Sequence, residues 1–343
     1  MSIRCAITMG DPSGIGPEVI AKTLAIPKIR KLADFTVIGD SWVIEKYASI
    51  KLICRDSPPC LSRNKFIDLQ NVPRKGFEFG KVKAEYGRAA LGYLDQAIAL
   101  IKDKKIDCLV TAPVHKEAMN LAGGLGYRKP NHGHLAGGPF SGHTGYLAQA
   151  FKSKDIRMML FNRKIKVILL TQHIPLKEVP KNITVQEILK TIVSADANLR
   201  TLFGVSQPRI AVCGLNPHAS DNGTIGSEEK EKIIPAITAA KRQKIEVEGP
   251  YPADTIFNRA ASGEYDCVIC MYHDQGLIPL KLTDFSHTVN ITLGLPFART
   301  SPGHGTAFDI AGKNKADPRS FIQAIETAIQ CAINLRKASA RTS

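Results

Sequence analysis

The sequence predicts an α/β protein with largely parallel sheets. Short runs rich in β-branched residues alternate with longer stretches in which apolar residues recur near every 3.6 positions, the pattern of strands alternating with amphipathic helices. The composition, 44% hydrophobic and 22% charged over 343 residues, is that of an ordinary globular protein of one large or two medium domains. It excludes disordered, collagen-like and coiled-coil classes.

Strand-like runs lie at 5–9, 35–40, 107–112, 166–171, 209–214, 266–272 and 288–294. The clearest helical periods lie at 17–25, 89–103, 185–203, 227–243 and 318–337. Gly204 directly follows one of these helices and Pro318 begins another, as expected of stop and start positions. No long polar linker interrupts the alternation, so the pattern alone does not locate a domain boundary.

The chain is expected to be cytoplasmic. No apolar run approaches the roughly 18 residues that a membrane span requires, and the first residues lack the apolar core of a signal peptide. The eight cysteines are scattered through apolar segments, which is typical of reduced thiols. Cys267 and Cys270 form a C-x-x-C, but this pair lies in an expected buried strand without a second pair, which disfavours a zinc knuckle.

The 46 Lys and Arg residues exceed the 31 Asp and Glu residues, giving a formal charge of +15. A nucleic-acid partner is the first alternative that such a charge raises. The basic residues are interspersed, however, and no nucleic-acid-binding motif organises them. We therefore expect a solvated surface that attracts a small anionic substrate, with no nucleic-acid or membrane partner.

A glycine-rich loop follows the first strand. Gly10, Gly14 and Gly16 precede Pro17, a favoured first residue of a helix. Such a loop either forms a tight turn or presents N–H groups to an anion. It matches neither the G-x-G-x-x-G nor the Walker pattern, so a tight turn is the preferred interpretation.

Three histidines, His173, His218 and His273, each follow an expected strand. Ligands bind at the carboxyl ends of parallel strands, so three imidazoles from three βα units are expected to converge. Three neutral imidazoles suit Zn, Co, Ni or Fe. A metal with an open coordination position could then polarise a substrate hydroxyl or carbonyl. A single histidine after a strand is more often structural; the repeated placement favours a metal site. Asp274 is a candidate ligand, orienting residue or base.

Further polar residues follow. Lys281, Asn290 and Arg299 form a set suited to phosphate or carboxylate. The pair His132 and His134 has the chemistry of a chelate but no third ligand nearby, which disfavours a metal site there.

Seven motifs in this order resemble the 4-hydroxythreonine-4-phosphate dehydrogenase family of pyridoxal phosphate biosynthesis. They are MGDPSGIGPE, TAPVHKEA, GHT, LNPHAS, GPYPADT, YHDQGLIPLK and HGTAFDIAGK, spread over residues 9–313. The last also resembles the segment of isopropylmalate and isocitrate dehydrogenases that holds the adenosine of the cofactor without a Rossmann fingerprint. The resemblance implies two α/β domains flanking a cleft. We expect a discontinuous first domain of 1–140 plus 290–343, with the cofactor loop at 300–313, and a second domain of 141–289.

The resemblance also implies an activity: NAD- or NADP-dependent oxidation of 4-phosphooxy-L-threonine to 2-amino-3-oxo-4-phosphooxybutanoate, which decarboxylates to 3-amino-2-oxopropyl phosphate. It implies a homodimer with the active site near the interface and one divalent metal, Zn, Co or Mg, per subunit. The resemblance implies that the metal ligands are His173, His218 and His273. It implies that the substrate-binding residues are His143, Thr144, Lys281, Asn290 and Arg299, and this sequence has the expected residue type at each position. We add cofactor candidates His304, Gly305, Thr306, Ala307 and Asp309, and proton-transfer candidates Asp254, Asp274 and Lys281.

Three departures leave the substrate open. Gly145 replaces a frequent Glu, and Pro302 and Gly303 replace a frequent Val-Asp pair before the cofactor loop. Related branches oxidise 4-phospho-D-threonate or the erythronate, or a dihydrodiol carboxylate. The retained anion-binding set favours a phosphorylated substrate.

Overall fold

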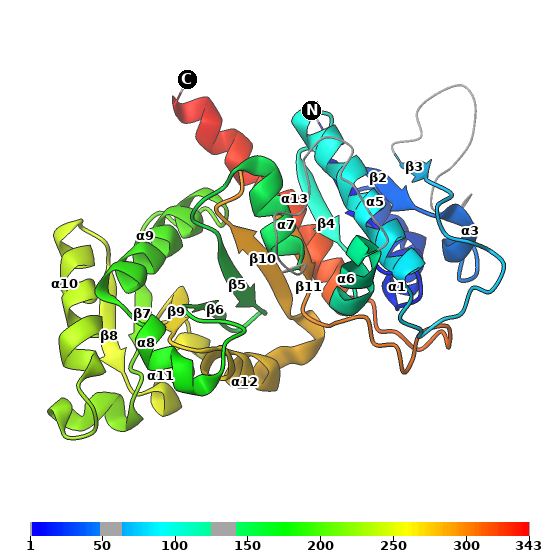
Figure 1. Cartoon of the computed structure of the whole chain (residues 1–343). Coiled ribbons are helices and arrows are strands. Elements are labelled where there is room, and N and C mark those ends of the chain that lie inside the picture. Colours follow the sequence, from blue (N-terminus) through cyan, green and yellow to red (C-terminus); the bar gives the residue numbers. More distant parts are fainter. Residues whose placement is uncertain (1, 49–63, 125–141, 343) are drawn as a thin grey trace. The chain divides into compact units, whose positions relative to one another are not determined.

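The computed structural model of the chain describes residues 2–48, 64–124 and 142–342 (Figure 1). The chain forms two compact units. Unit 1 is Met1–Lys154 with Leu295–Ile333, and unit 2 is Asp155–Gly294 with Asn334–Ser343. Unit 1 is therefore discontinuous in sequence. The boundaries expected at 140 and 290 stay a prediction.

Unit 1 is built on a parallel sheet in the order β3-β2-β1-β4-β11. Its strands are β1 (Arg4–Thr8), β2 (Asp34–Gly39), β3 (Lys65–Asp68), β4 (Cys108–Thr111) and β11 (Ala298–Pro302). All four residues of β4 and all five of β11 are buried. Burial of every residue is typical of a parallel strand covered on both faces, although β11 buries the polar side chains of Arg299, Thr300 and Ser301.

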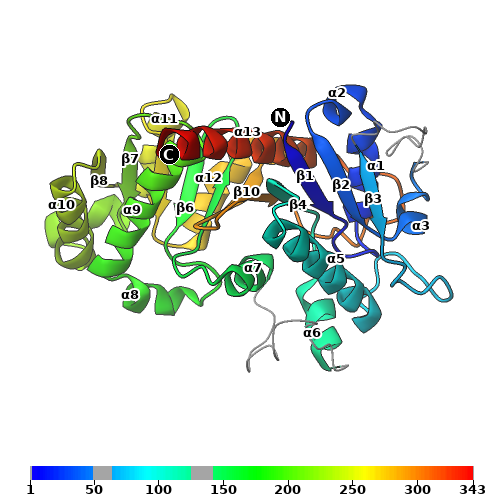
Figure 2. The same cartoon turned by 90° about the horizontal axis from the view of Figure 1, so that it is seen from above.

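The helices of unit 1 are α1 (Gly16–Ala25), α2 (Pro27–Arg30), α3 (Ser41–Ile44), α5 (Ala84–Lys102), α6 (Lys116–Gly124), α7 (His143–Phe151) and most of α13 (Arg319–Thr342). Figure 2 shows α5 beside α6. Gly87 of α5 permits this approach, because a Cβ there would lie 2.0 Å from the backbone oxygen of Ala118.

The sheet of unit 2 has the order β10-β5-β6-β9-β7-β8. Its strands are β5 (Arg157–Phe161), β6 (Lys166–Leu169), β7 (Ile210–Cys213), β8 (Val247–Tyr251), β9 (Cys267–Cys270) and β10 (Val289–Leu293). Strand β5 runs antiparallel to both neighbours, and the other pairs are parallel. The connection from β5 to β6 is a tight turn in which Asn162 Oδ1 accepts from the N–H groups of Lys164 and Ile165.

The helices of unit 2 follow its strands. They are η1 (Leu176–Glu178), α8 (Val179–Asn182), α9 (Val185–Thr201), η2 (Pro217–Gly223), the π-helix η3 (Glu229–Ile233), α10 (Ile234–Arg242), α11 (Ala253–Ala261), α12 (His273–Asp284) and η4 (Phe285–His287). Thr184 caps α9 by accepting from the N–H of Glu187. Helices α9 and α10 pack side by side (Figures 1 and 2).

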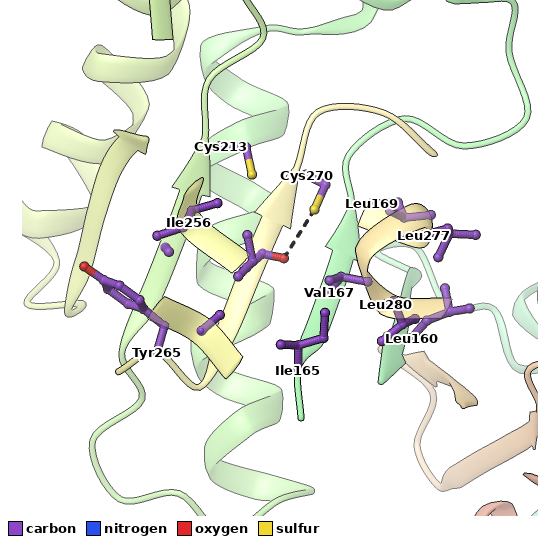
Figure 3. Close-up of a cluster of buried hydrophobic side chains, with 13 residues drawn as sticks. Leu160, Ile165, Val167, Leu169, Cys213, Ile256, Tyr265, Cys270, Leu277 and Leu280 are labelled. Atoms are coloured by element: carbon purple, nitrogen blue, oxygen red, sulfur yellow. Dashed lines mark hydrogen bonds between the residues drawn. The ribbon is translucent and has the colours of Figure 1, made fainter. Parts of the chain in front are cut away.

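The core of unit 2 contains cysteines as small apolar side chains. Figure 3 shows Cys213 of β7 and Cys270 of β9 among Ile256, Val167 and Leu280. The cysteines of the described residues are free and buried. Burial raises the pKa of Cys267 to about 12, so this thiol stays protonated. The C-x-x-C is therefore part of the core, as expected.

The α/β class is confirmed, and each of the seven expected strands is present within one or two residues of its expected bounds. The sequence pattern did not indicate the strands β3, β5, β8 and β11, the helices α6, α7, α11 and α12, or the helices of three to seven residues other than η3. Among the helices of the described residues, none is both long and apolar enough to cross a membrane.

Candidate active site

His173 and His273 lie together at one edge of the unit 2 sheet. Strands β6 and β9 are parallel neighbours, and each histidine follows one of them. Their ring centroids are 5.8 Å apart. Two imidazoles that bind one divalent ion through bonds of about 2.1 Å hold their ring centres roughly 5 to 6 Å apart. The pair therefore has the chemistry and the spacing to hold two positions of an ion.

Asp274 orients one of these rings. Its Oδ1 lies 2.7 Å from Nδ1 of His273. A carboxylate that accepts the Nδ1 proton leaves the Nε2 lone pair of the imidazole available for a metal ion. Of the three roles open for Asp274, this contact favours that of orienting residue.

A cavity of about 340 Å³ adjoins the histidine pair. Its lining combines polar and apolar side chains. The lining residues are Gln172, His173, Ile174, Leu176, Val179, Tyr272, His273 and Asp274. This volume is at the lower end of the range for small-molecule sites. Asp254, the other acidic candidate, lies exposed in the first turn of α11 and does not line this cavity.

His218 is not brought to this pair. Among residues 2–48, 64–124 and 142–342, no three His, Cys, Asp or Glu side chains lie close enough to hold a metal ion. His218 lies exposed in η2, where it and the next four residues have left-handed backbone angles with φ between 44° and 71°. Buried Glu229 fixes the approach to this turn, because its Oε1 accepts from the N–H groups of Leu215 and Asn216 at 2.8 Å.

Arg299 is a buried cation in β11 of unit 1. It is 2% exposed, and its Nη2 donates to Thr111 Oγ1 at 2.6 Å. Burial lowers the pKa of Arg299 from 12.5 to about 9, because the charged guanidinium is poorly solvated there. A guanidinium in such a place can bind a carboxylate or phosphate through two parallel hydrogen bonds.

His143 and Thr144 begin α7 in the same unit. The Nε2 atom of His143 is buried and has no hydrogen-bond partner. Burial first, and then the charge of Arg299, hold the pKa of His143 well below its usual value. The imidazole is therefore neutral at pH 7, beside a helix N-terminus that favours anions.

This shift makes a pH prediction. The pKa of His143 is lower in the folded than in the unfolded chain, so the unfolded chain binds more protons below about pH 6.5. The free energy of unfolding therefore decreases as the pH is lowered through this range. Replacing His143 by Asn is expected to reduce the loss of unfolding free energy between pH 7.5 and pH 5.5 by about 1 kcal/mol. Urea unfolding of both proteins at the two pH values measures this. Equal losses in the two proteins would contradict it.

The other substrate candidates lie in unit 2. Asn290 is half-buried in β10, and its Oδ1 is buried without a hydrogen-bond partner. Lys281 lies exposed on α12, with its Nζ 5.9 Å from the centre of the Phe285 ring. Both side chains are thus available to a ligand. His132 and His134 lie outside the described residues.

The five cofactor candidates fall in one segment without helix or strand, residues 303–318, here called the cofactor segment. His304 Nε2 is buried and has no hydrogen-bond partner, so it is free to contact a ligand. Ala307 has φ 43°, a conformation that residues other than glycine seldom adopt outside functional sites. Gly305 and Asp309 are exposed. An orphaned ring nitrogen and an exposed strained loop fit a dinucleotide.

The glycine-rich loop forms a tight turn, as preferred. Residues 11–16 are all buried, and their N–H groups donate within the protein, for example Gly14 to Asp11 O at 3.1 Å and Ile15 to Thr306 O at 3.0 Å. Asp11 Oδ1 also accepts from Ser13 N at 2.9 Å. The loop is therefore a support for the cofactor segment.

Sequence reasoning assigned no role to Glu18, Lys22 or Glu229. The Glu18–Lys22 spacing of four residues was the available indication, since such pairs meet on a helix. Nothing comparable marks Glu229, whose contacts depend on a turn that the sequence pattern does not reveal.

The chain is similar to known proteins over nearly its whole length. Residues 31–328 match the family "Pyridoxal phosphate biosynthetic protein PdxA". A 4-hydroxythreonine-4-phosphate dehydrogenase of Sulfurihydrogenibium sp. is 42% identical over 95% of this chain and 98% of the relative. A D-threonate 4-phosphate dehydrogenase of Cupriavidus necator is also 42% identical, over 95% of this chain and 96% of the relative. A crystal structure of 4-hydroxythreonine-4-phosphate dehydrogenase from Klebsiella pneumoniae matches 97% of this chain and 98% of that chain, with 39% identity and a TM-score of 0.81.

Fold, site and relatives together define an enzyme of the dehydrogenase class, an oxidoreductase. The chain belongs to the PdxA family of pyridoxal phosphate biosynthetic proteins. The expected family and class are confirmed.

Proposed function

We propose that this enzyme oxidises 4-phosphooxy-L-threonine with NAD or NADP, in pyridoxine 5'-phosphate biosynthesis. The product, 2-amino-3-oxo-4-phosphooxybutanoate, loses CO2 to give 3-amino-2-oxopropyl phosphate. The observation that carries the proposal is Arg299, a guanidinium that is 2% exposed in β11 and donates to Thr111 Oγ1, because a buried guanidinium suits the two-pronged binding of an anionic group. The 42% identity to a relative of that name supports the same substrate.

His173 and His273 are the residues that would hold a divalent ion, Zn, Co or Mg. The family resemblance makes His218 the third candidate, although it lies apart from the pair in η2. Such an ion would supply Lewis-acid chemistry at the substrate hydroxyl and the product ketone, and a bound nicotinamide would serve as the hydride acceptor. Asp274 keeps the Nδ1 proton on His273 and so presents Nε2 to the ion. The PdxA resemblance and the spacing of the two rings support this assignment.

The chain's own polar atoms bind and orient the substrate. Arg299 and Lys281 bind its anionic groups, and the first turn of α7 adds the N–H groups of a helix N-terminus. His143 Nε2 and Asn290 Oδ1, both buried without partners, hydrogen-bond its hydroxyl or amino groups. Lys281 Nζ and Asp254 remain the candidates for proton transfer. His304, Gly305, Thr306, Ala307 and Asp309 bind the cofactor.

The enzyme is proposed to work as a homodimer. Helix α12 exposes Ile278 and Leu282, and Phe285 at the start of η4 is exposed three residues further on. Leu176 at the cavity is exposed as well. A second copy of the chain covers this apolar face. Sedimentation equilibrium of the wild type and of Leu282→Glu tests the assembly.

A second substrate has a specific observation in its favour. The relative named D-threonate 4-phosphate dehydrogenase is as similar to this chain as the first, at 42% identity. Gly145 lies in the first turn of α7, next to Thr144, and removes a side chain from the region proposed to bind substrate.

The deciding experiment measures NADH formation from 4-phosphooxy-L-threonine and from 4-phospho-D-threonate, using chelator-treated protein with and without added divalent metal. Metal-dependent turnover of the first substrate is the expected result. Turnover of the second alone would move the protein to the sister activity. Turnover of neither, with NAD or with NADP, would overturn the proposed function.

A further inference from the structure

An ion pair in α1, with a buried carboxylate and a partly exposed lysine, has no part in the proposed chemistry. Glu18 is fully buried, and its Oε1 lies 2.7 Å from Nζ of Lys22 one helical turn later. Lys22 is only partly buried, with 29% of its side chain exposed. Removing the carboxylate of Glu18 from water is costly, and a well-packed apolar pair is often equally stable. The pair therefore calls for a role besides holding α1 in place.

Both charges contact the far end of the cofactor segment. Lys22 Nζ donates to the carbonyl oxygens of Asn314 at 3.0 Å and Ala316 at 2.9 Å. Glu18 Oε1 accepts from the N–H of Ala316 at 2.6 Å. Two side chains thus make three hydrogen bonds to backbone that lies almost 300 residues later in the sequence.

The start of the same helix holds the near end of the segment. Ile15 N donates to Thr306 O at 3.0 Å, and a Cβ on Gly14 would lie 3.1 Å from that oxygen. Between the two ends, Gly312 N donates to Tyr47 Oη at 3.1 Å. Helix α1 and the loop before it therefore fix both ends of a segment that has no regular structure of its own.

Such fixing matters for binding. Ordering a backbone costs conformational entropy, and a loop that is ordered before the ligand arrives binds more tightly because this entropy is not lost on binding. Ala307 and Asn314 have φ of 43° and 57°, conformations that persist only when the surroundings impose them.

We propose that Glu18 and Lys22 are positioning residues that hold the cofactor segment in the shape that binds the dinucleotide. The inference rests on the proposed role of this segment in cofactor binding. Neither residue touches the reacting atoms, so their loss weakens dinucleotide binding and leaves the chemical step unchanged.

The test compares Lys22→Met with Lys28→Met, a matched control on an exposed lysine of the neighbouring helix α2. Calorimetric titration with NAD, and with NADP, is expected to give a Kd about tenfold higher for Lys22→Met than for the wild type. At saturating cofactor, kcat and the substrate KM are expected to stay within twofold. Hydrogen exchange without cofactor is expected to accelerate in 304–316 and not in unit 2.

Glu18→Gln is the second variant, for the case that Lys22→Met does not fold. It keeps an oxygen that accepts from Ala316 N but removes the charge that holds Lys22, and a roughly threefold rise in Kd is expected. Lys22→Arg, which retains the charge and donors, is expected to recover part of the affinity. A wild-type Kd in a folded variant of Lys22 or Glu18 would overturn the inference and leave the proposed cofactor intact. A wild type that binds neither NAD nor NADP would overturn both.

Discussion

Alanine in place of His273 is expected to reduce divalent-metal affinity by at least about 100-fold and to reduce turnover to a similar extent. The change removes one of the two imidazole rings whose centroids lie 5.8 Å apart. Losing only the hydrogen-bond partner of a metal-binding histidine already lowers metal affinity about 10- to 100-fold. Competition with a chromogenic chelator measures the affinity, and NADH formation measures the turnover.

His287→Ala is the matched control for this change. His287 also pairs with a carboxylate, Asp284, at 2.8 Å, but it does not line the cavity. Its loss is expected to leave metal affinity within a factor of two. Full metal binding and activity in His273→Ala would make the metal assignment wrong. Equal losses in both variants would indicate a general effect on unit 2.

The second large effect is expected at Arg299. Replacement by Met keeps much of the side-chain volume and removes the buried charge, and losing one partner of a buried charged contact costs about 2 to 5 kcal/mol. We therefore expect kcat/KM to fall about 100- to 1000-fold, with Arg299→Lys recovering only part because it cannot form a two-pronged contact. Steady-state kinetics at saturating cofactor measure the loss.

The pKa of about 9 gives the Arg299 prediction a pH signature. Below pH 9 the free enzyme carries the cation that binds the substrate anion, and above it the free enzyme progressively loses this charge. Substrate affinity of the wild type is therefore expected to fall above pH 9, and that of Arg299→Met is expected not to show this step. Arg157→Met, which removes the partner of Glu187 in unit 2, is the control. A wild-type kcat/KM in Arg299→Met would contradict the anion site.

The strands that carry the site were predictable because they are buried on both faces. Runs such as 107–112 and 266–272 have no periodicity to misread, and polar residues at their ends mark the ligand-binding edge. Parallel pairing of β6 and β9 then brings His173 and His273 together. The α/β alternation predicts that these strands end at one edge of the sheet, whereas the order that places β9 beside β6 does not follow from it.

Other parts depend on features without a sequence pattern. Helix α12 was not expected, because Gly276 and Pro279 weaken the helical period and its exposed face is apolar. The antiparallel direction of β5 depends on the side chain of Asn162, which closes the turn before β6. The place of His218 depends on five successive left-handed residues, a conformation that local propensity does not favour.

The discontinuity of unit 1 has a consequence during synthesis. Strand β10, the last strand of unit 2 to be synthesised, ends at residue 293. Strand β4 of unit 1 pairs with β11, which is synthesised later and begins at residue 298. Until then, a growing chain presents β4, a fully buried strand of the finished protein, as an open edge on which other chains can pair. The ribosome thus releases unit 2 nearly complete, while the segment with Arg299 and the cofactor residues both closes that edge and supplies binding groups. Truncation after residue 294 is expected to cause aggregation together with loss of activity.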